Sequence, residues 1–249
     1  MQKNALSTTR SKKPVRPRWV PAVSASGQRR GYGGRSAAEL VLERRRRLID
    51  AGLELFATRG YLKTQIELIC AESRVTTRHF YEQFNSREAL LAAVFEEAVL
   101  HLGDTVRRSL RRAPDLAPTL RIANAIRALA RASTRYPRRS RIICIETVGV
   151  SPEMEQRRRT VIHEFAQAVE VHAQRLAQAG ELPQRNYHLS CVAMVGALIA
   201  LVTEWLTAEN PPSAQVLSDE LLSLFQAIVL GAQAHVPDLM RGRRLTARK

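Results

Sequence analysis

The feature that most restricts the fold is a helical spacing of apolar residues, which begins near Glu39 and continues, interrupted by prolines, almost to the end of the chain. Leu48, Leu53 and Phe56, for example, fall on one face of such a helix. No pair of strand-like segments is visible, and the abundance of Ala, Leu, Arg and Glu favours helices. We therefore predict an all-α fold.

Prolines and capping residues divide this periodic region into nine predicted helices. Gly60 is a plausible end for the first one, and Thr64 is a residue type that starts helices. The predicted ranges are 38–58, 64–73, 77–84, 87–112, 117–135, 138–149, 153–179, 186–208 and 213–235.

The positive charge lies at the two ends of the chain. Of the net charge of +16, residues 1–47 supply 13 Lys or Arg against two acids, and residues 241–249 supply five basic residues. Residues 1–38 are rich in Pro, Gly, Ser and Arg without periodicity, which predicts a disordered basic arm. Basic ends around a neutral body indicate contact with a polyanion such as DNA phosphate, although a solubilising tail explains them equally well.

The three cysteines, Cys70, Cys144 and Cys191, are far apart and form no CxxC pair, so we expect neither a disulfide framework nor a zinc site. The most apolar run, Leu189–Thr203, is shorter than a bilayer requires and is bounded by His188 and Glu204. We expect a buried helix there, no membrane partner, and a location in the cytoplasm.

Residues 64–84 have the pattern of a helix-turn-helix. Ile66, Ile69 and Cys70 can pack the second predicted helix against its neighbours. Phe80 and Phe84 are four residues apart, so the opposite face of the third helix is left polar and free to enter a major groove.

The stretch from Arg45 to Val99 contains, in this order, Leu55-Phe56, Gly60, Thr64, Ile69-Cys70, Arg74-Val75-Thr76, Phe80-Tyr81-Glu82-Gln83-Phe84 and Arg87-Glu88-Ala89-Leu90. In the order and spacing of these residues, the stretch resembles the DNA-binding domain of the TetR family of transcription regulators.

The resemblance implies roles for individual residues. Tyr81 and Arg87 are expected to contact DNA phosphate, with Thr64 and Gln65 beside the DNA backbone. The residues expected to face base edges are Thr76, Thr77, Arg78 and His79. The alternatives are a packing role for Tyr81 and a solvated helix face for Arg78 and His79.

The chain departs from the family pattern at two positions. Arg74 replaces the glycine of the turn, which would strain the backbone if φ is positive there. Gln83 replaces a frequent histidine, although we retain Gln83 as a candidate DNA contact. Arg44–Arg47 either form a charged helix face or neutralise phosphate. The predicted DNA-binding region itself is not basic, because residues 48–96 hold five basic and seven acidic residues.

Residues 100–236 contain no pattern of catalytic residues. His163-Glu164 is followed by Gln167 where a zinc protease needs its second histidine, and His163 and Glu170 on one helix face are weak evidence for a metal. We therefore expect no enzyme, no cofactor and no metal site.

The resemblance also implies that the last two helices, 186–208 and 213–235, pair with a second copy to form a homodimer. The other helices of this region are expected to enclose a pocket for a small-molecule effector. Its candidate residues are Phe95, Leu102, Leu129, Ile143, Cys144, Glu146, Val148, Met154, Phe165, Val169 and Met194. Glu146 would select a cationic or hydroxylated ligand, or else pair with a nearby arginine; the many arginines of residues 107–135 form a solvated face or favour an anionic effector.

We thus expect four parts: the arm (1–38), a helix-turn-helix domain (39–86), a helical effector-binding and dimerisation domain (87–236) and a basic tail (237–249). The expected function is a DNA-binding regulator, in particular a repressor that binds a palindromic operator and associates with the nucleoid. The alternatives are sequence-nonspecific, architectural DNA binding through the arm and tail, and a ligand-binding protein or enzyme that has lost its DNA role.

Overall fold

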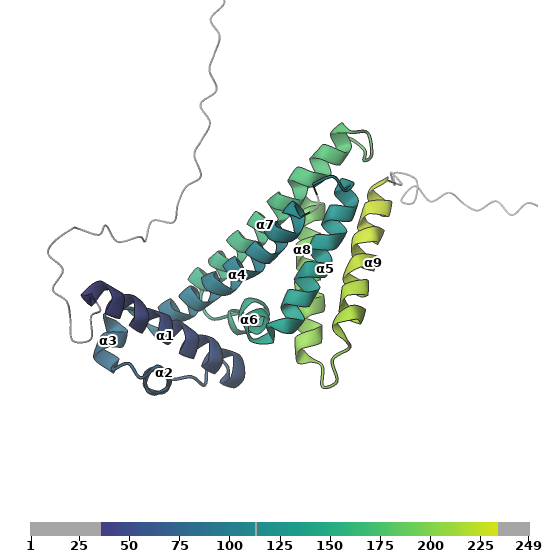
Figure 1. Ribbon diagram of the computed structural model, residues 1–249. Coiled ribbons are helices and arrows are strands. Elements are labelled where there is room, and N and C mark those ends of the chain that lie inside the picture. Colours follow the sequence, from purple (N-terminus) through teal and green to yellow (C-terminus); the bar gives the residue numbers. More distant parts are fainter. Residues whose placement is uncertain (1–35, 113, 234–249) are drawn as a thin grey trace, which may run out of the picture. The chain divides into compact units, whose positions relative to one another are not determined.

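The computed structural model describes residues 36–112 and 114–233, and every regular element in these stretches is a helix (Figure 1). The predicted all-α fold is confirmed. The elements are α1 (Ala37–Arg59), α2 (Ile66–Ser73), α3 (Thr77–Tyr81), α4 (Arg87–Arg111), α5 (Pro118–Arg135), α6 (Pro137–Arg141), the π-helix η1 (Ile142–Glu146), α7 (Pro152–Gln178), α8 (His188–Thr207) and α9 (Ala214–Gln233). The basic tail and all but the last three residues of the predicted arm lie outside the described residues.

Two predicted helices differ from the structure by more than two residues at an end. The third ends at Tyr81 rather than Phe84. The helix predicted for residues 138–149 is a short α6 followed by the π-helix η1. The Thr147 hydroxyl donates to the Ile142 carbonyl at 3.1 Å, five residues back, which suits the wider π-helical turn.

The first three helices and the start of α4 share one apolar core. Leu48 and Phe56 of α1, Ile69 of α2, Phe80 of α3 and Leu90 of α4 are all fully buried in it. The predicted apolar face of α1 is therefore the face that packs. We call this part, from α1 to the first half of α4, the head.

The turn between α2 and α3 contains the strained residue that the sequence predicts. Arg74 has φ 53° and ψ 42°, in the left-handed region, and its N–H donates to the Ala71 carbonyl at 3.2 Å. This conformation lets Val75 turn back into the core, where its N–H donates to the Cys70 carbonyl at 3.0 Å. A residue with a Cβ atom adopts it at a cost of about 1–2 kcal/mol.

Helix α4 continues from the head into the rest of the helical part, from the second half of α4 to α9, which we call the second region. Ser86 caps it, since its Oγ accepts from the Ala89 N–H at 3.0 Å. Beyond the head, α4 packs along α5, α5 along α9, and α7 along α8. Residues 41–233 belong to one compact unit, so the division at residue 86 remains a prediction about function.

Helices α8 and α9 are only partly buried by the rest of the described chain. Only 22% of the residues in the most apolar window of each helix are buried, and both are long and apolar enough to cross a membrane by length and composition. The exposed residues of α8 repeat every three or four positions and so form one face, which consists of Leu189, Ala193, Gly196, Ala200, Glu204 and Thr207.

We predict that Arg74→Gly raises the free energy of unfolding by about 0.5–1 kcal/mol, because glycine removes the left-handed strain and loses only part of that gain to a more flexible unfolded chain. Urea denaturation measures the change.

The matched control is Arg112→Gly. Arg112 is also an exposed arginine at a helix C-terminus, but its φ is −67°. Glycine there relieves no strain and should destabilise the protein slightly; equal shifts in both variants would contradict the assigned strain.

Candidate functional site

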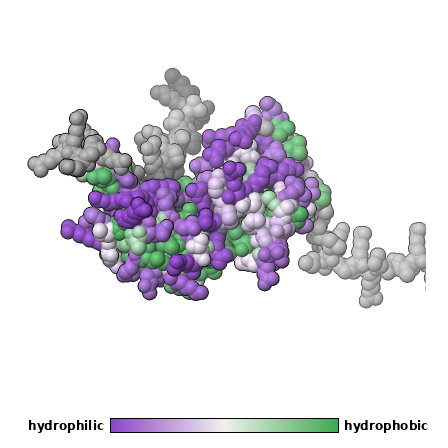
Figure 2. Space-filling view, turned by 60° about the horizontal axis from the view of Figure 1, so that its bottom comes forward, coloured by the Kyte–Doolittle hydropathy of each residue, from purple (hydrophilic) through white to green (hydrophobic). Residues whose placement is uncertain are grey.

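Helix α3 presents a polar N-terminal face to solvent. Thr76 caps the helix, since its Oγ1 accepts from the His79 N–H at 3.3 Å and lies 2.8 Å from His79 Nδ1. Thr77 and Arg78 are exposed, whereas Phe80, on the other side, is fully buried. Figure 2 turns toward the reader the side of Figure 1 that holds α2 and α3, and hydrophilic residues cover most of it. The four residues predicted to face base edges thus lie together at one helix end.

Arg78 is free to reorient toward a partner. Its side chain is 88% exposed, and among the described residues its one ion pair is with Glu82, at 3.4 Å at the C-terminal end of the same helix. An exposed pair of this kind stabilises by only about 0.2–1 kcal/mol. A guanine edge or a phosphate could therefore displace Glu82 at little cost.

Tyr81 is 53% exposed and packs only the edge of its ring against Phe80, with 5.4 Å between the ring centroids. In the described part of the chain its hydroxyl has no hydrogen-bond partner. Gln83 is half-buried, and its backbone carbonyl accepts from Arg45 Nη1 at 3.2 Å. Tyr81 is therefore available for a contact with another molecule. The backbone of Gln83 is held by Arg45, and its side chain is only partly exposed.

Thr64 does not have its predicted place. The residue that precedes α2 as its N-cap is Gln65, which is exposed. Thr64 is fully buried, and its hydroxyl donates to the Gly60 carbonyl at 2.8 Å. The prediction that Thr64 begins the helix is wrong by two residues, and its side chain is occupied in closing the turn after α1.

Arg87 braces the start of α2. Its Nη1 donates to the Thr64 carbonyl at 2.7 Å, and its guanidinium carbon lies 4.4 Å from the centroid of the Tyr61 ring. A guanidinium has more N–H groups than these two contacts use, so Arg87 can still donate to a phosphate. The phosphate contact stays a prediction.

Two head residues, Arg45 and Tyr61, make contacts within the protein that the sequence did not predict. Arg45 lies over the Phe84 ring at 4.4 Å, and Tyr61 packs against Phe56 with centroids 5.5 Å apart. The sequence positions of both residues indicate packing. Arg45 is three residues before the buried Leu48 on the same helix face, and Tyr61 directly follows the helix-ending Gly60. Arg46 forms ion pairs with both Asp50 and Glu97. Arg45 and Arg46 thus both make contacts within the protein.

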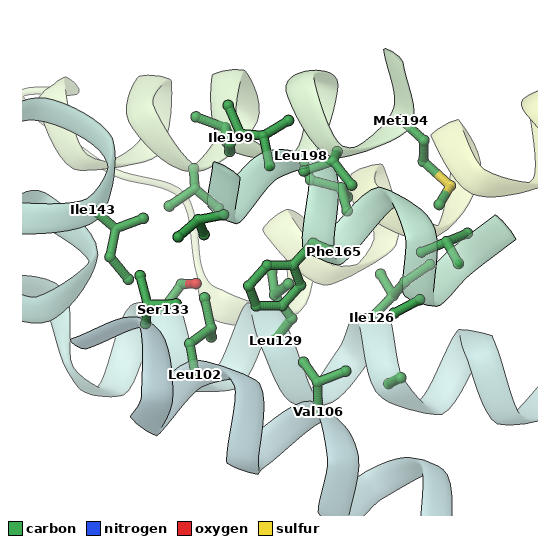
Figure 3. A pocket seen from close by; sticks show the side chains of 18 of the residues that line it. Leu102, Val106, Ile126, Leu129, Ser133, Ile143, Phe165, Met194, Leu198 and Ile199 are labelled. Atoms are coloured by element: carbon green, nitrogen blue, oxygen red, sulfur yellow. The ribbon is translucent and has the colours of Figure 1, made fainter. Parts of the chain in front are cut away.

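The second region contains a cavity of about 150 Å³ between α4, α5, α7 and α8, with contributions from α6 and η1. Of the predicted pocket residues, those that line it are Leu102, Leu129, Ile143, Cys144, Phe165, Val169 and Met194. Figure 3 shows Phe165 projecting between Leu129 and Leu198.

Four residues predicted for the pocket lie elsewhere. Phe95 and Met154 are buried in the core of the head, Val148 is exposed, and Glu146 faces the head. Phe95 lies on the same apolar face of α4 as the cavity residues Val99 and Leu102. The spacing of apolar residues therefore could not tell which of them belong to the core of the head and which line the cavity.

The cavity wall is almost entirely hydrocarbon. Its polar side chains are Ser133, Ser140, His172 and Cys144, and none of the lining residues is Asp, Glu, Lys or Arg. Ser140 donates to the Ser133 carbonyl at 3.2 Å, and burial raises the pKa of the Cys144 thiol to about 11. A thiol that stays protonated near neutrality is a poor nucleophile, so the wall suits binding rather than chemistry.

Glu146 joins the cavity segment to the head. Its carboxylate is 9% exposed; one oxygen accepts from the Tyr61 backbone N–H at 2.9 Å and the other from Arg141 Nε at 3.0 Å. Ile143 and Cys144, on the same short π-helix, line the cavity. The alternative that Glu146 pairs with an arginine is thus the one observed.

Two further polar contacts join the head to the second region. The Ser151 hydroxyl, at the start of α7, donates to the Glu88 carboxylate, and Arg138 Nε lies 2.9 Å from Glu54 Oε2. Together with Glu146 they connect α6, η1 and α7 to α1 and α4.

The residues considered for a metal have other contacts. The His163 ring stacks on His188, with centroids 5.7 Å apart and planes 3° apart, and His188 Nδ1 lies 3.4 Å from Glu170 Oε2. Among the described residues no group of three or more His, Cys, Asp or Glu is arranged to hold a metal ion.

Comparison with known proteins finds a family model described as "Bacterial regulatory proteins, tetR family", which matches residues 48–94. The HTH-type transcriptional regulator RutR of Escherichia coli (strain K12) is 30% identical over 120 residues, which are 48% of this chain and 54% of RutR. The chain thus spans about half the length of the curated relatives it matches.

Solved structures share the fold over most of the chain. The fatty acid degradation regulator FadR from Bacillus halodurans has a TM-score of 0.66 at 17% identity, covering 76% of this chain and 95% of that one. FadR from Bacillus subtilis, solved in complex with stearoyl-CoA, has a TM-score of 0.63 at 20% identity, covering 75% and 98%.

We predict that Glu146→Gln lowers the free energy of unfolding by about 1.5–3 kcal/mol, because a neutral amide loses the charge-assisted hydrogen bonds from Tyr61 and Arg141. Urea denaturation measures the loss, and hydrogen exchange at the Tyr61 amide should become faster.

Glu164→Gln is the control, since Glu164 is an exposed glutamate in the middle of α7. Its stability should change by less than about 0.5 kcal/mol. An unchanged exchange rate at Tyr61 in the Glu146 variant would show that the bridge does not restrain the head.

Proposed function

We propose that this chain, which belongs to the tetR family of bacterial regulatory proteins, binds operator DNA as a homodimer and releases it when a small molecule enters the cavity. In this proposal the protein is a repressor, acts on the nucleoid in the cytoplasm and carries out no enzymatic reaction.

The observation that carries the proposal is the exposed N-terminal end of α3. Thr76, Thr77, Arg78 and His79 project from a short helix that Phe80 and the strained turn at Arg74 fix to the core. This is the part of a helix-turn-helix that enters a major groove. It also lies within residues 48–94, which match the family.

We assign base contacts to these four residues and phosphate contacts to Tyr81, Gln65 and Arg87. Arg78 has the exposure to reach a guanine with two hydrogen bonds. Thr64 is left out because its hydroxyl is buried and bonded within the head.

The dimer is supported by the surface of α8. Its exposed face bears mostly small and apolar residues, and the helix contains no Asp, Lys or Arg and one Glu, Glu204. At Gly196 an added Cβ would meet nothing within 4 Å, so a second helix could approach closely there. A second copy would cover this face and hold two α3 helices about 34 Å apart, the spacing of successive major-groove turns.

The effector is supported by the cavity and its link to the head. A ligand between α4, α5, α7 and α8 would press on Ile143 and Cys144, next to Glu146. It can shift the DNA-binding equilibrium only as far as it prefers one arrangement of the head over the other. The FadR complex with stearoyl-CoA makes an acyl chain a reasonable kind of occupant.

The central test is DNA binding by Arg78→Ala and Tyr81→Phe, measured by fluorescence anisotropy on a site footprinted near the protein's own gene. Arg78→Ala should weaken operator binding by about 1–3 kcal/mol and leave binding to unrelated DNA nearly unchanged, because a base contact is lost. Tyr81→Phe should weaken binding to both DNAs, because phosphate is common to all sequences.

Arg185→Ala and Tyr136→Phe are the matched controls, exposed and remote from α3 in the sequence. An equal loss on both DNAs for Arg78→Ala would contradict base reading. If removal of residues 1–35 abolished binding while Arg78→Ala had no effect, the architectural alternative would replace this proposal.

Ala200→Glu should yield a monomer, because it buries an unpaired charge in the middle of the proposed α8 interface. Analytical ultracentrifugation should give 27.9 kDa for the variant and twice that mass for the unmodified chain. Ala117→Glu, an exposed alanine at the start of α5, should remain dimeric; a dimeric Ala200→Glu would place the interface elsewhere.

A further inference from the structure

The two ends of the cavity differ in their polar surroundings. Figure 3 shows Ser133 and Ile143 on one side of Phe165 and Met194 and Ile126 on the other. The end near Ile143 adjoins η1 and Cys144, whose thiol is neutral. The opposite end, lined by Leu110, Ile122 and His172, we call the far end.

A guanidinium lies next to the far end, outside the lining itself. Arg121 Nε and Nη2 donate to the Leu110 carbonyl at 3.3 and 3.0 Å, and Leu110 and the neighbouring Ile122 both line the cavity. In the described residues Arg121 has no carboxylate partner within ion-pair distance, and its Nη1 takes no part in these bonds.

His172 is the one histidine among the residues that line the cavity. Burial is the main cause that lowers its pKa, and the positive charges of Arg175 and Arg121 lower it further. Arg175 lies on the next turn of α7 and is exposed. No carboxylate contributes to this balance, so the surroundings of His172 are cationic.

We propose that the cavity takes an amphiphile, with its hydrocarbon part against Phe165 and its anionic head group at Arg121, His172 and Arg175. This inference rests on the proposed function, because it names the class of effector for the same cavity. It replaces the cationic or hydroxylated ligand considered for Glu146, whose carboxylate is bonded to the head.

The chemistry of the far end favours an anion over other head groups. An arginine without an acidic partner, next to a second one, is stabilised by a carboxylate or phosphate that accepts two N–H bonds. A cationic head group would meet like charges in a partly desolvated place. A neutral head group would leave the guanidinium charge uncompensated.

The size of the cavity limits the hydrocarbon part. Lining residues of α4 run from Val99 to Leu110, a helical rise of about 16 Å. A volume of about 150 Å³ is suited to an apolar group the size of benzene, and a longer chain requires the surrounding helices to separate. An occupant of medium length would thus change the helices that hold η1.

The test uses the full chain and four probes with the same alkyl length: octanoate, octanol, octyltrimethylammonium and octanoyl-CoA, with binding measured by calorimetry. Octanoate should bind about tenfold more tightly than octanol, the difference expected between a charge-assisted and a neutral hydrogen bond. The ammonium compound should bind more weakly than octanol.

Arg175→Gln should reduce the preference for octanoate over octanol by about threefold or more and leave octanol binding unchanged, which shows that the cavity is intact. Arg159→Gln is the matched control, because Arg159 is an exposed arginine of the same helix that lies near Glu155, away from His172. It should change neither probe.

The outcomes separate the inference from the function on which it rests. Equal binding of octanoate and octanol, or failure of all four probes to bind, overturns the anionic head group, while operator footprinting still decides the regulator itself. Octanoyl-CoA binding more tightly than octanoate, with the gain lost in Arg175→Gln, supports the inference with phosphate as the anion; the reverse order supports it with a free carboxylate.

Discussion

The carboxylate of Glu146 is one of the contacts that join the two parts, together with the Ser151–Glu88 and Arg138–Glu54 pairs and the packing of Ile142 and Met154 against the core of the head. It is nearly buried, and both of its oxygens are held, one by the backbone of Tyr61 in the head and one by Arg141. A buried acid with both partners in place is stable, but the loss of either leaves a costly unpaired charge. The short π-helix can therefore move little without moving the turn after α1.

That turn leads directly to α2 and α3, the helices proposed to contact DNA. Tyr61 packs beneath the Arg87 guanidinium, which donates to the Thr64 carbonyl two residues before α2 begins. A continuous set of short contacts thus runs from the cavity wall at Cys144 to the start of α2. Double-mutant cycles between Glu146 and Arg87 would measure the energetic coupling along these contacts.

The sequence was most informative where a local rule decides the structure. Helix starts at prolines and the strained Arg74 follow from the chemistry of one or two neighbouring residues. It was least informative for Phe95 and Glu146. Spacing places both on faces directed inward, but which interior each one enters depends on how helices distant in the sequence pack together.

The exposed face of α8 has a consequence for a single copy of the chain, before the proposed dimer forms. A newly made copy carries Leu189, Ala193 and Ala200 in contact with water, and apolar surface of this kind favours association of any sort. Stability then becomes a property of concentration as well as of sequence. For the proposed dimer, the folded fraction would therefore rise with the total concentration of the chain.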